Sequence, residues 1–255
     1  MPENQPSARR RIDFAGLRVP TANYSLPAPS ETLHLGPNTP DRFDAFYTGR
    51  LAVSDLTAAE TEFLRDHFHT QLDAVRAQNI AAFERRVPRR YATARPNAAA
   101  TDWANAVTVD PPTAPSLLVL GPTGTGKTHF AYGALRAVAE TGLRVQWLAF
   151  TEPDLFAHLR PSSGRDDDQA LRSVASADLL FIDDLGAAKL SDWTEEVTYR
   201  VINYRYEQCL PGIYTSNIPP KELAAAIGGR IASRLTEMCD RITLKGDDLR
   251  KGTRP

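Results

Sequence analysis

The feature that most constrains the fold of this chain is a short apolar run that leads directly into a glycine-rich loop. Residues 117–120 read LLVL, the pattern of a strand buried on both faces. Residues 121–128 read GPTGTGKT and match G-x-x-x-x-G-K-[ST]. A helical pattern follows, so the loop has the strand–loop–helix context that the motif requires. The alternative, a glycine-rich turn that binds nothing, does not explain this context.

The loop carries the residue types that binding a polyphosphate requires. Its three glycines let the backbone turn tightly, and its N–H groups can then point at phosphate oxygens. Lys127 can reach the β- and γ-phosphates, and the Thr128 hydroxyl can ligate Mg²⁺ at the positive end of a helix. The residues that we predict to bind nucleotide are Gly121, Pro122, Thr123, Gly124, Thr125, Gly126, Lys127, Thr128 and His129.

Two acidic residues follow a second apolar run, at residues 179–182. A carboxylate at the tip of a buried strand, downstream of a phosphate loop, can hold Mg²⁺, and Asp183 is our choice. Asp184 would then polarise the attacking water as general base. Residues 212–217 form a strand that we expect between the other two, which places Asn217 beside the γ-phosphate. The alternative for all three side chains is ordinary turn chemistry at strand ends.

Composition excludes several classes of protein. A chain of 255 residues can hold one α/β domain and a smaller extension, and a net charge of −1 gives no strong field toward nucleic acid. Cys209 and Cys239 are too few for a disulfide framework or a four-cysteine zinc site, which suits a reducing cytoplasm. The N-terminus lacks the apolar stretch of a signal peptide, and the apolar runs are too short to span a membrane. We therefore expect a cytoplasmic protein.

The N-terminal third differs from the rest. Residues 1–53 are rich in Pro, Ser, Asn and Thr, and we expect a mostly extended arm. Thr57 and Glu60 fit a capping box, after which a helix is expected to run to about Arg86. Its apolar stripe either binds a partner protein or packs on its own domain. Residues 85–91 form a basic segment that could reach the base or the phosphates, and Pro96 with the following alanines is interpreted as a linker.

Taken together, the motifs resemble those of AAA+ ATPases. The segments that carry the resemblance are GPTGTGKT, LLFIDDLG, PGIYTSN and IASRL. More narrowly, they are similar to helicase loaders of the DnaC/DnaI type and to the related IstB transposition ATPases, and VPRRYATA is also similar to that group. The resemblance covers about residues 85–250. It implies an α/β three-layer P-loop NTPase sandwich with a mostly parallel five-stranded sheet and a truncated lid, preceded by a helical and extended extension.

The resemblance also implies roles for individual residues. ATP or ADP with Mg²⁺ would bind at residues 121–129, with Asp183 on the metal and Asp184 on the water. Asn217 would match the sensor-1 position. Arg234 would match the arginine finger, which acts on ATP bound to a neighbouring subunit, and Arg230 is the second candidate. Arg250 would match a sensor-2 arginine. A finger supplied in trans implies head-to-tail self-association in a spiral or ring.

The function implied is an ATPase that loads the hexameric replicative helicase onto single-stranded DNA. A transposition ATPase that selects duplex DNA targets is the main alternative, because the motifs alone do not separate the two. A small-molecule kinase would need a lid that the chain after Leu244 is too short to form. A module that binds ATP without hydrolysing it does not explain the paired aspartates. We expect an arm at 1–53, a partner-binding helix and basic linker at 54–90, and the ATPase domain at 91–255.

Overall fold

The computed structural model describes residues 11–14, 17–20, 39–48, 50–161 and 166–246. The chain divides into two compact units. One comprises residues 1–82 with 142–144, and the other comprises residues 83–141 with 145–255. The division falls inside helix α3, Ala58–Arg86, whose extent confirms the predicted helix.

The larger unit is built on a five-stranded sheet in the order β4-β5-β6-β3-β7, in which every pair of neighbours is parallel. Its strands are β3 Ser116–Leu120, β4 Trp147–Thr151, β5 Leu179–Asp183, β6 Gly212–Ser216 and β7 Cys239–Thr243. The prediction that residues 212–217 insert between the first and third strands is confirmed, since β6 pairs with both β3 and β5. Parallel strands with a common direction bring their carboxyl ends to one edge, where ligands bind in such folds.

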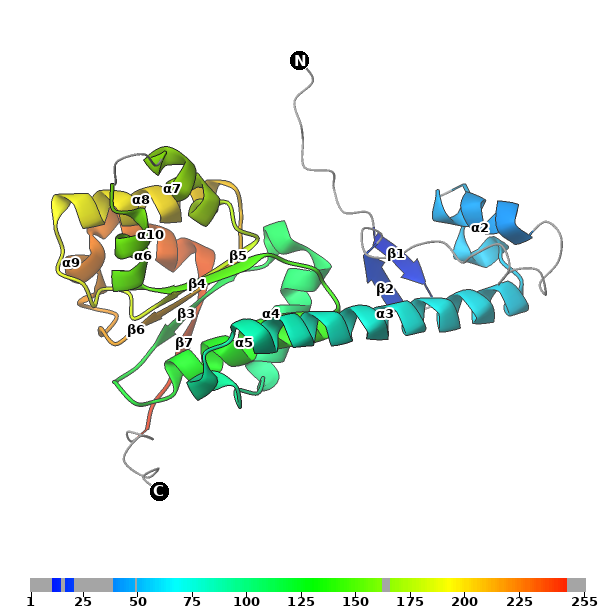
Figure 1. Ribbon diagram of the computed structural model, residues 1–255, viewed down its shortest axis with the longest axis horizontal. Helices are drawn as coiled ribbons and strands as arrows, with labels where there is room; N and C mark the ends of the chain where they lie inside the picture. Colours follow the sequence, from blue (N-terminus) through cyan, green and yellow to red (C-terminus); the bar gives the residue numbers. More distant parts are fainter. Residues whose placement is uncertain (1–10, 15–16, 21–38, 49, 162–165, 247–255) are drawn as a thin grey trace, which may run out of the picture. The chain divides into compact units, whose positions relative to one another are not determined.

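Helices cover both faces of this sheet. They are α4 Ala98–Val109, α5 Lys127–Thr141, α6 Glu152–Leu159, α7 Asp167–Ala175, α8 Asp192–Glu207, α9 Leu223–Ile227 and α10 Gly229–Met238, with the short helices η4 Arg89–Tyr91 and η5 Pro111–Thr113. Figure 1 shows α4 and α5 on one face and α6 to α10 on the other. This is the three-layer α/β sandwich expected from the sequence. The truncated lid was expected in the segment after β7. The structure describes residues 244–246 of that segment, and the rest lies outside the described residues.

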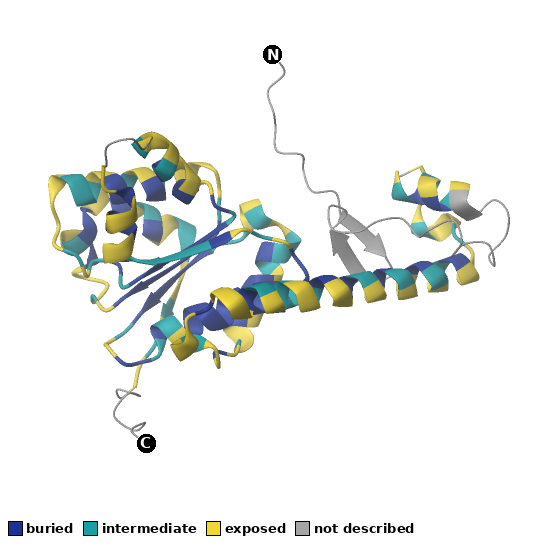
Figure 2. Cartoon of the chain, in the orientation of Figure 1, coloured by how far each residue is buried: buried dark blue, intermediate teal, exposed yellow. Residues whose placement is uncertain are grey.

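The central strands supply the core because their sequences are apolar on both faces. Every residue of β3, β5 and β6 is buried, as the dark blue strands of Figure 2 show. Alternate side chains serve opposite layers. The rings of Phe181 and Tyr132 of α5 pack nearly perpendicular to each other, whereas Leu180 and Ile182 join a core cluster that includes buried residues of α8. The strand ends are therefore fixed from both sides.

Helix α4 corrects one sequence interpretation. The alanines after Pro96 were assigned to a linker, but they form the first turn of α4. The side chain of Asn97 caps this turn by accepting a hydrogen bond from the Ala100 N–H at 3.0 Å. Alanine is the strongest helix former, so a capped alanine run continues as helix rather than as linker.

The smaller unit contains β1 Arg11–Phe14 paired antiparallel with β2 Leu17–Pro20, then helix α2 Thr39–Tyr47, the short helix η3 Val53–Asp55 and the first part of α3. The expectation of a mostly extended arm is wrong at α2. Phe43 and Phe46 lie three residues apart and bury against Leu64 and Phe68 of α3. This burial stabilises a helix that the proline-rich composition had argued against.

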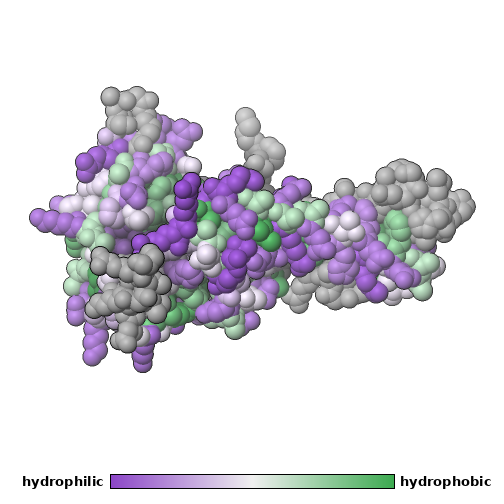
Figure 3. All heavy atoms as spheres, turned by 60° about the horizontal axis from the view of Figure 1, so that its bottom comes forward, coloured by the Kyte–Doolittle hydropathy of each residue, from purple (hydrophilic) through white to green (hydrophobic). Residues whose placement is uncertain are grey.

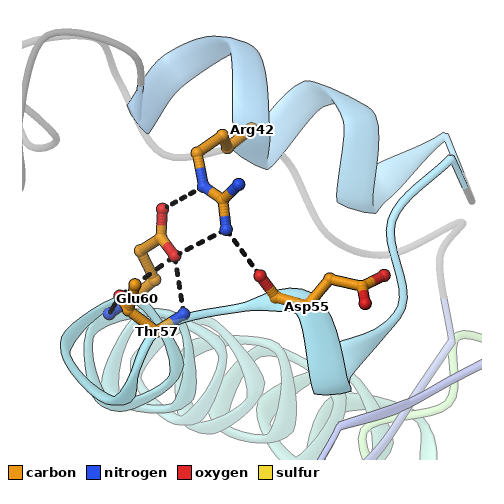
Figure 4. Close-up of polar contacts among 4 residues, drawn as sticks. All are labelled: Arg42, Asp55, Thr57 and Glu60. Atoms are coloured by element: carbon orange, nitrogen blue, oxygen red, sulfur yellow. Dashed lines mark hydrogen bonds and ion pairs between the residues drawn. The ribbon is translucent and has the colours of Figure 1, made fainter.

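The start of α3 is held by a small polar network, shown in Figure 4. The Thr57 N–H donates to Glu60 Oε2 at 2.8 Å and the Glu60 N–H donates to Thr57 Oγ1 at 3.2 Å, which confirms the capping box. Arg42 of α2 donates to both carboxylate oxygens of Glu60, at 2.7 and 3.2 Å. The hydrogen bond from Arg42 lowers the pKa of the buried Glu60 carboxyl. Glu60 therefore joins the capping of α3 to the packing of α2.

The surface of the described residues is mostly polar. Figure 3 shows hydrophilic residues over most of the visible face, with hydrophobic residues in separate patches. Leu190 and Tyr204 are the large apolar side chains that stand exposed in the described ranges. None of the helices described is both long enough and apolar enough to cross a lipid bilayer.

Candidate functional site

The loop between β3 and α5 has the backbone that the sequence predicted. Gly124 and Gly126 have φ angles of +86° and +89°, a left-handed conformation that favours glycine. The loop leads directly into α5, so the first N–H groups of that helix face the same space. Beside it is a cavity of about 570 Å³, within the usual range for small-molecule sites. Residues 123–130, Asp184, Asn217 and Leu244 line this cavity.

Lys127 is buried and points back across the loop. Its Nζ donates to the carbonyl oxygens of Gly121 and Pro122 at 2.8 and 2.9 Å, and to Asn217 Oδ1 at 2.5 Å. Gly121 and Pro122 do not line the cavity, and they contact Lys127 through their carbonyl oxygens. The ammonium group is thus held at the cavity by oxygen atoms that a phosphate could replace.

Asp183 lies at the carboxyl end of β5 with two hydroxyl groups on its carboxylate. Thr128 Oγ1 donates to it at 3.0 and 3.1 Å, and Thr215 Oγ1 donates at 2.6 Å. Burial raises the pKa of the Asp183 carboxyl, and the two threonine hydrogen bonds act in the opposite direction. A divalent cation here would favour the ionised carboxylate.

The donor set fits Mg²⁺. Thr128 and Asp183 present oxygen atoms only, and oxygen is the ligand that Mg²⁺ prefers. Among the residues that the structure describes, no group of three His, Cys, Asp or Glu could hold a metal. Mg²⁺ in nucleotide sites needs no such cage, because phosphates and waters complete its shell.

Asn217 connects Lys127 to the second aspartate. Its Nδ2 donates to Asp184 Oδ1 at 2.8 Å, while its Oδ1 accepts from Lys127. Asp184 has φ of +55°, which is uncommon for a residue other than glycine, and its N–H donates to Thr215 Oγ1 at 2.9 Å. The structure thus brings together Lys127, Thr128, Asp183, Asp184 and Asn217, as the sequence predicted.

Some residues of the site were missed or only partly anticipated. Thr215 contacts both aspartates, and its only signal was a polar side chain near the end of a buried strand. The basic segment does reach the cavity through Arg90 and Tyr91, followed by Arg95. The Tyr91 ring stacks on Tyr132 at 5.0 Å. Tyr91 lines the cavity and Tyr132 lies behind it, where burial raises the pKa of Tyr132 to about 12.

The two candidates for the arginine finger, Arg234 and Arg230, do not line this cavity. Arg234 of α10 donates from Nε to Asn203 at 2.6 Å and from Nη2 to the Tyr199 hydroxyl at 3.1 Å, both on α8. Arg230 is exposed on the same helix. Arg250 lies outside the described residues. A finger that acts in trans does not need to line the cavity of its own chain.

The fold and site together define an AAA+ ATPase, in which a parallel sheet presents a phosphate loop and an acidic strand end at one edge. The chain belongs to the family of IstB-like ATP binding proteins, whose model matches residues 102–255, more than half of its length.

The relatives of this chain include proteins of a phage-like element and of an insertion sequence, and a helicase loader. Protein XkdC of the phage-like element PBSX from Bacillus subtilis is 31% identical over 129 residues, which is 49% of this chain and 47% of XkdC. An ATP-binding protein of insertion sequence IS5376 from Geobacillus stearothermophilus is 31% identical over 143 residues, 53% of this chain and 55% of that protein. The chain therefore spans about half the length of the curated relatives it matches. The crystal structure of the DnaC helicase loader superposes with a TM-score of 0.52 and 28% identity, covering 62% of this chain and 100% of that one.

Proposed function

We propose that this chain is an ATPase that loads a hexameric replicative helicase onto single-stranded DNA. The observation that carries the proposal is the likeness to the DnaC helicase loader, which extends over the whole of that crystal structure at 28% identity. A second feature supports it. Residues 1–82 with 142–144 form a compact unit separate from the nucleotide site, and such a unit can serve partner binding.

The site supports ATP hydrolysis by positioning and electrostatics. The loop amides and Lys127 would bind the phosphates, and Thr128 with Asp183 would hold Mg²⁺. When bound, the metal ion neutralises charge on the phosphate oxygens. Asp184 would accept a proton from the attacking water, and the amide of Asn217 would fix the orientation of that carboxylate.

Completion of the site would come from a second copy of the chain. Arg234, or Arg230 as the second candidate, would place its guanidinium on ATP bound to the neighbouring subunit. This contact is head-to-tail and builds a ring or an open spiral. Single-stranded DNA would follow basic residues of that assembly, without reading its sequence. Hydrolysis of ATP at the subunit interfaces would then alter the contacts between subunits and release the helicase.

A transposition ATPase acting on duplex DNA is the second candidate, and specific observations favour it. They are the match to the IstB-like family and the 31% identity to the insertion-sequence protein. The same ATP chemistry would serve both functions. What differs is the partner, a helicase or a transposase, and the form of DNA.

The deciding experiment mixes the full chain with the replicative helicase of the same genome and circular single-stranded DNA coated with single-strand-binding protein. We expect ATP-dependent transfer of helicase onto the circle, read as strand unwinding, and no transfer with Asp184→Asn. Binding to a transposase, with ATPase activity stimulated by duplex DNA and no helicase transfer, would instead establish the second candidate.

A further inference from the structure

Glu152 is a buried carboxylate whose place in the fold is not explained by its own helix. It is the first residue of α6, directly after β4, and is 4% exposed. The N-terminus of α6 already has a cap, because the Asp154 N–H donates to Thr151 Oγ1 at 3.2 Å. Within the described ranges Glu152 forms no ion pair, although burying a carboxylate without one is unfavourable.

The carboxylate instead binds the backbone after the second aspartate. The Gly186 N–H donates to Glu152 Oε1 at 3.0 Å, and the Ala188 N–H donates to Oε2 at 2.8 Å. Both oxygens of one side chain on β4–α6 therefore hold the loop that leaves β5. This loop begins at Asp184, two residues before Gly186.

The other side of the loop is held by β6. The Asp184 N–H donates to Thr215 Oγ1 at 2.9 Å, and the Leu185 N–H donates to the Thr215 carbonyl oxygen at 2.7 Å. Asp184 has a positive φ, a conformation that persists only where the surroundings fix it. Glu152, at the start of the helix that follows β4, and Thr215 of β6 thus hold the same turn from the two sides of β5.

We propose that Glu152 is a positioning residue for ATP hydrolysis, whose carboxylate fixes residues 186–188 so that Asp184 stays directed at Asn217 and the attacking water. The inference rests on the proposed role of Asp184 as the residue that activates water. It adds a part of the machinery that contacts neither nucleotide nor metal. Glu152 acts through the backbone, and the nucleotide cavity does not include it.

The test is Glu152→Gln in the full chain. The amide keeps the length of the side chain and one acceptor, but its NH₂ group cannot accept from an N–H. We expect kcat to fall about tenfold, while the Kd for ATP stays within about twofold, because a misplaced catalytic group affects the chemical step alone. Glu152→Asp, which withdraws the carboxylate by one methylene, should show the same split.

A matched control lies two residues away. Asp154 is exposed in the first turn of the same helix, and its carboxylate accepts from the Thr151 hydroxyl at 2.7 Å. Asp154→Asn should leave kcat unchanged. Hydrogen exchange provides a readout independent of activity: the amides of 186–188 should exchange faster in Glu152→Gln, and those of β3 and α5 should not.

Two results would overturn the inference. One is an unchanged kcat in Glu152→Gln, whatever the exchange rates of the amides at 186–188. The other is a loss of ATP affinity equal to the loss of kcat, which would indicate general damage. Asp184→Asn, assayed in parallel, separates the two hypotheses. If Asp184→Asn still hydrolyses ATP, the role of Asp184 is wrong; if it does not and Glu152→Gln is fully active, only the role of Glu152 is wrong.

Discussion

Lys127 is the residue on which we expect nucleotide binding to depend most directly. In the structure its ammonium group is satisfied by two carbonyl oxygens of its own loop and by Asn217, 90 residues further along the chain. ATP would exchange these neutral acceptors for charged phosphate oxygens, and charge-assisted hydrogen bonds are roughly twice as strong as neutral ones.

Lys127→Ala is expected to abolish measurable ATP binding. Several hydrogen bonds to charged groups are lost, each of about 1.5–3 kcal/mol, so affinity should fall at least ~100-fold. Titration calorimetry with ATP and Mg²⁺ measures this. Lys221→Ala, at an exposed lysine outside the cavity, should bind ATP like the wild type. Equal affinity in the Lys127 variant would contradict the phosphate-loop assignment.

Asp183→Asn should increase stability while it removes hydrolysis. Burial raises the pKa of Asp183, so as pH rises through that pKa the wild type must ionise a buried group and loses stability. The Asn variant keeps an oxygen for both threonine hydroxyls. We expect its melting midpoint to exceed that of the wild type by a few degrees at neutral pH in chelator.

This gain should shrink as pH falls through the pKa of Asp183, because the wild-type carboxyl is then neutral as well. Asp102→Asn, on the exposed surface of α4, should leave the midpoint unchanged at each pH. If Asp183→Asn is less stable than the wild type at neutral pH, burial of the ionised Asp183 carboxylate does not destabilise the protein, contrary to this prediction.

For single residues, the sequence predicted which side chains form the site but not the hydrogen bonds between them. Asp183 and Asn217 were predictable because they follow apolar strands in a parallel sheet. The bonds from Thr215 to Asp183 and from Asn217 to Lys127 were not, since they depend on which rotamers the packed strand ends allow. Glu152 gave no signal beyond its place at a helix start.

Among the elements, the helix pair α2–α3 shows most clearly how tertiary packing overrides local sequence. The capping box at Thr57 and Glu60 was readable because its spacing is local. Helix α2 was not, because its stability comes from Phe43 and Phe46 burying against α3 and from Arg42 reaching Glu60. The place of β6 between β3 and β5, by contrast, was predicted from the apolar runs and their polar ends.

Glu60→Gln tests this junction through its pH dependence. The Arg42 hydrogen bond lowers the pKa of Glu60 below its ordinary value, so the stabilisation is present above that value and is lost as pH falls through the lowered pKa. The melting midpoint of the wild type should be higher than that of Glu60→Gln at pH 7. The difference between the two midpoints should vanish in acid.

The control for this effect is Asp44→Asn. Asp44 pairs with Arg50, but 52% of the Asp44 side chain is exposed, and exposed pairs contribute little. Its substitution should change the midpoint little at any pH. A Glu60→Gln variant as stable as the wild type at pH 7 would contradict a stabilising ion pair at this junction.

For the whole molecule, the proposed mechanism of hydrolysis uses two copies of the chain. The nucleotide cavity of a single chain includes neither Arg230 nor Arg234. Self-association in a head-to-tail arrangement would supply the missing positive charge. The surfaces that would form this contact were not predictable from the sequence, because they meet only in the assembly.

Arg234→Ala should bind ATP nearly as well as the wild type and lose about 10³-fold in hydrolysis by the assembled protein. Mixing it with Asp184→Asn should restore activity, because the second variant supplies an intact Arg234 to the intact site of the first. Turnover assays across mixing ratios measure this. Arg230→Ala in the same mixture identifies which arginine acts, and no recovery with either one would contradict a finger in trans.

The central claim is that ATP occupies the space between the loop after β3 and the ends of β5 and β6. The most direct measurement is a crystal structure of the full chain with Mg²⁺ and a non-hydrolysable ATP analogue. We predict that Lys127 leaves its loop carbonyls for the phosphates, with Mg²⁺ beside Thr128 and Asp183. A nucleotide bound elsewhere, with Lys127 still on Gly121 and Pro122, would contradict the account.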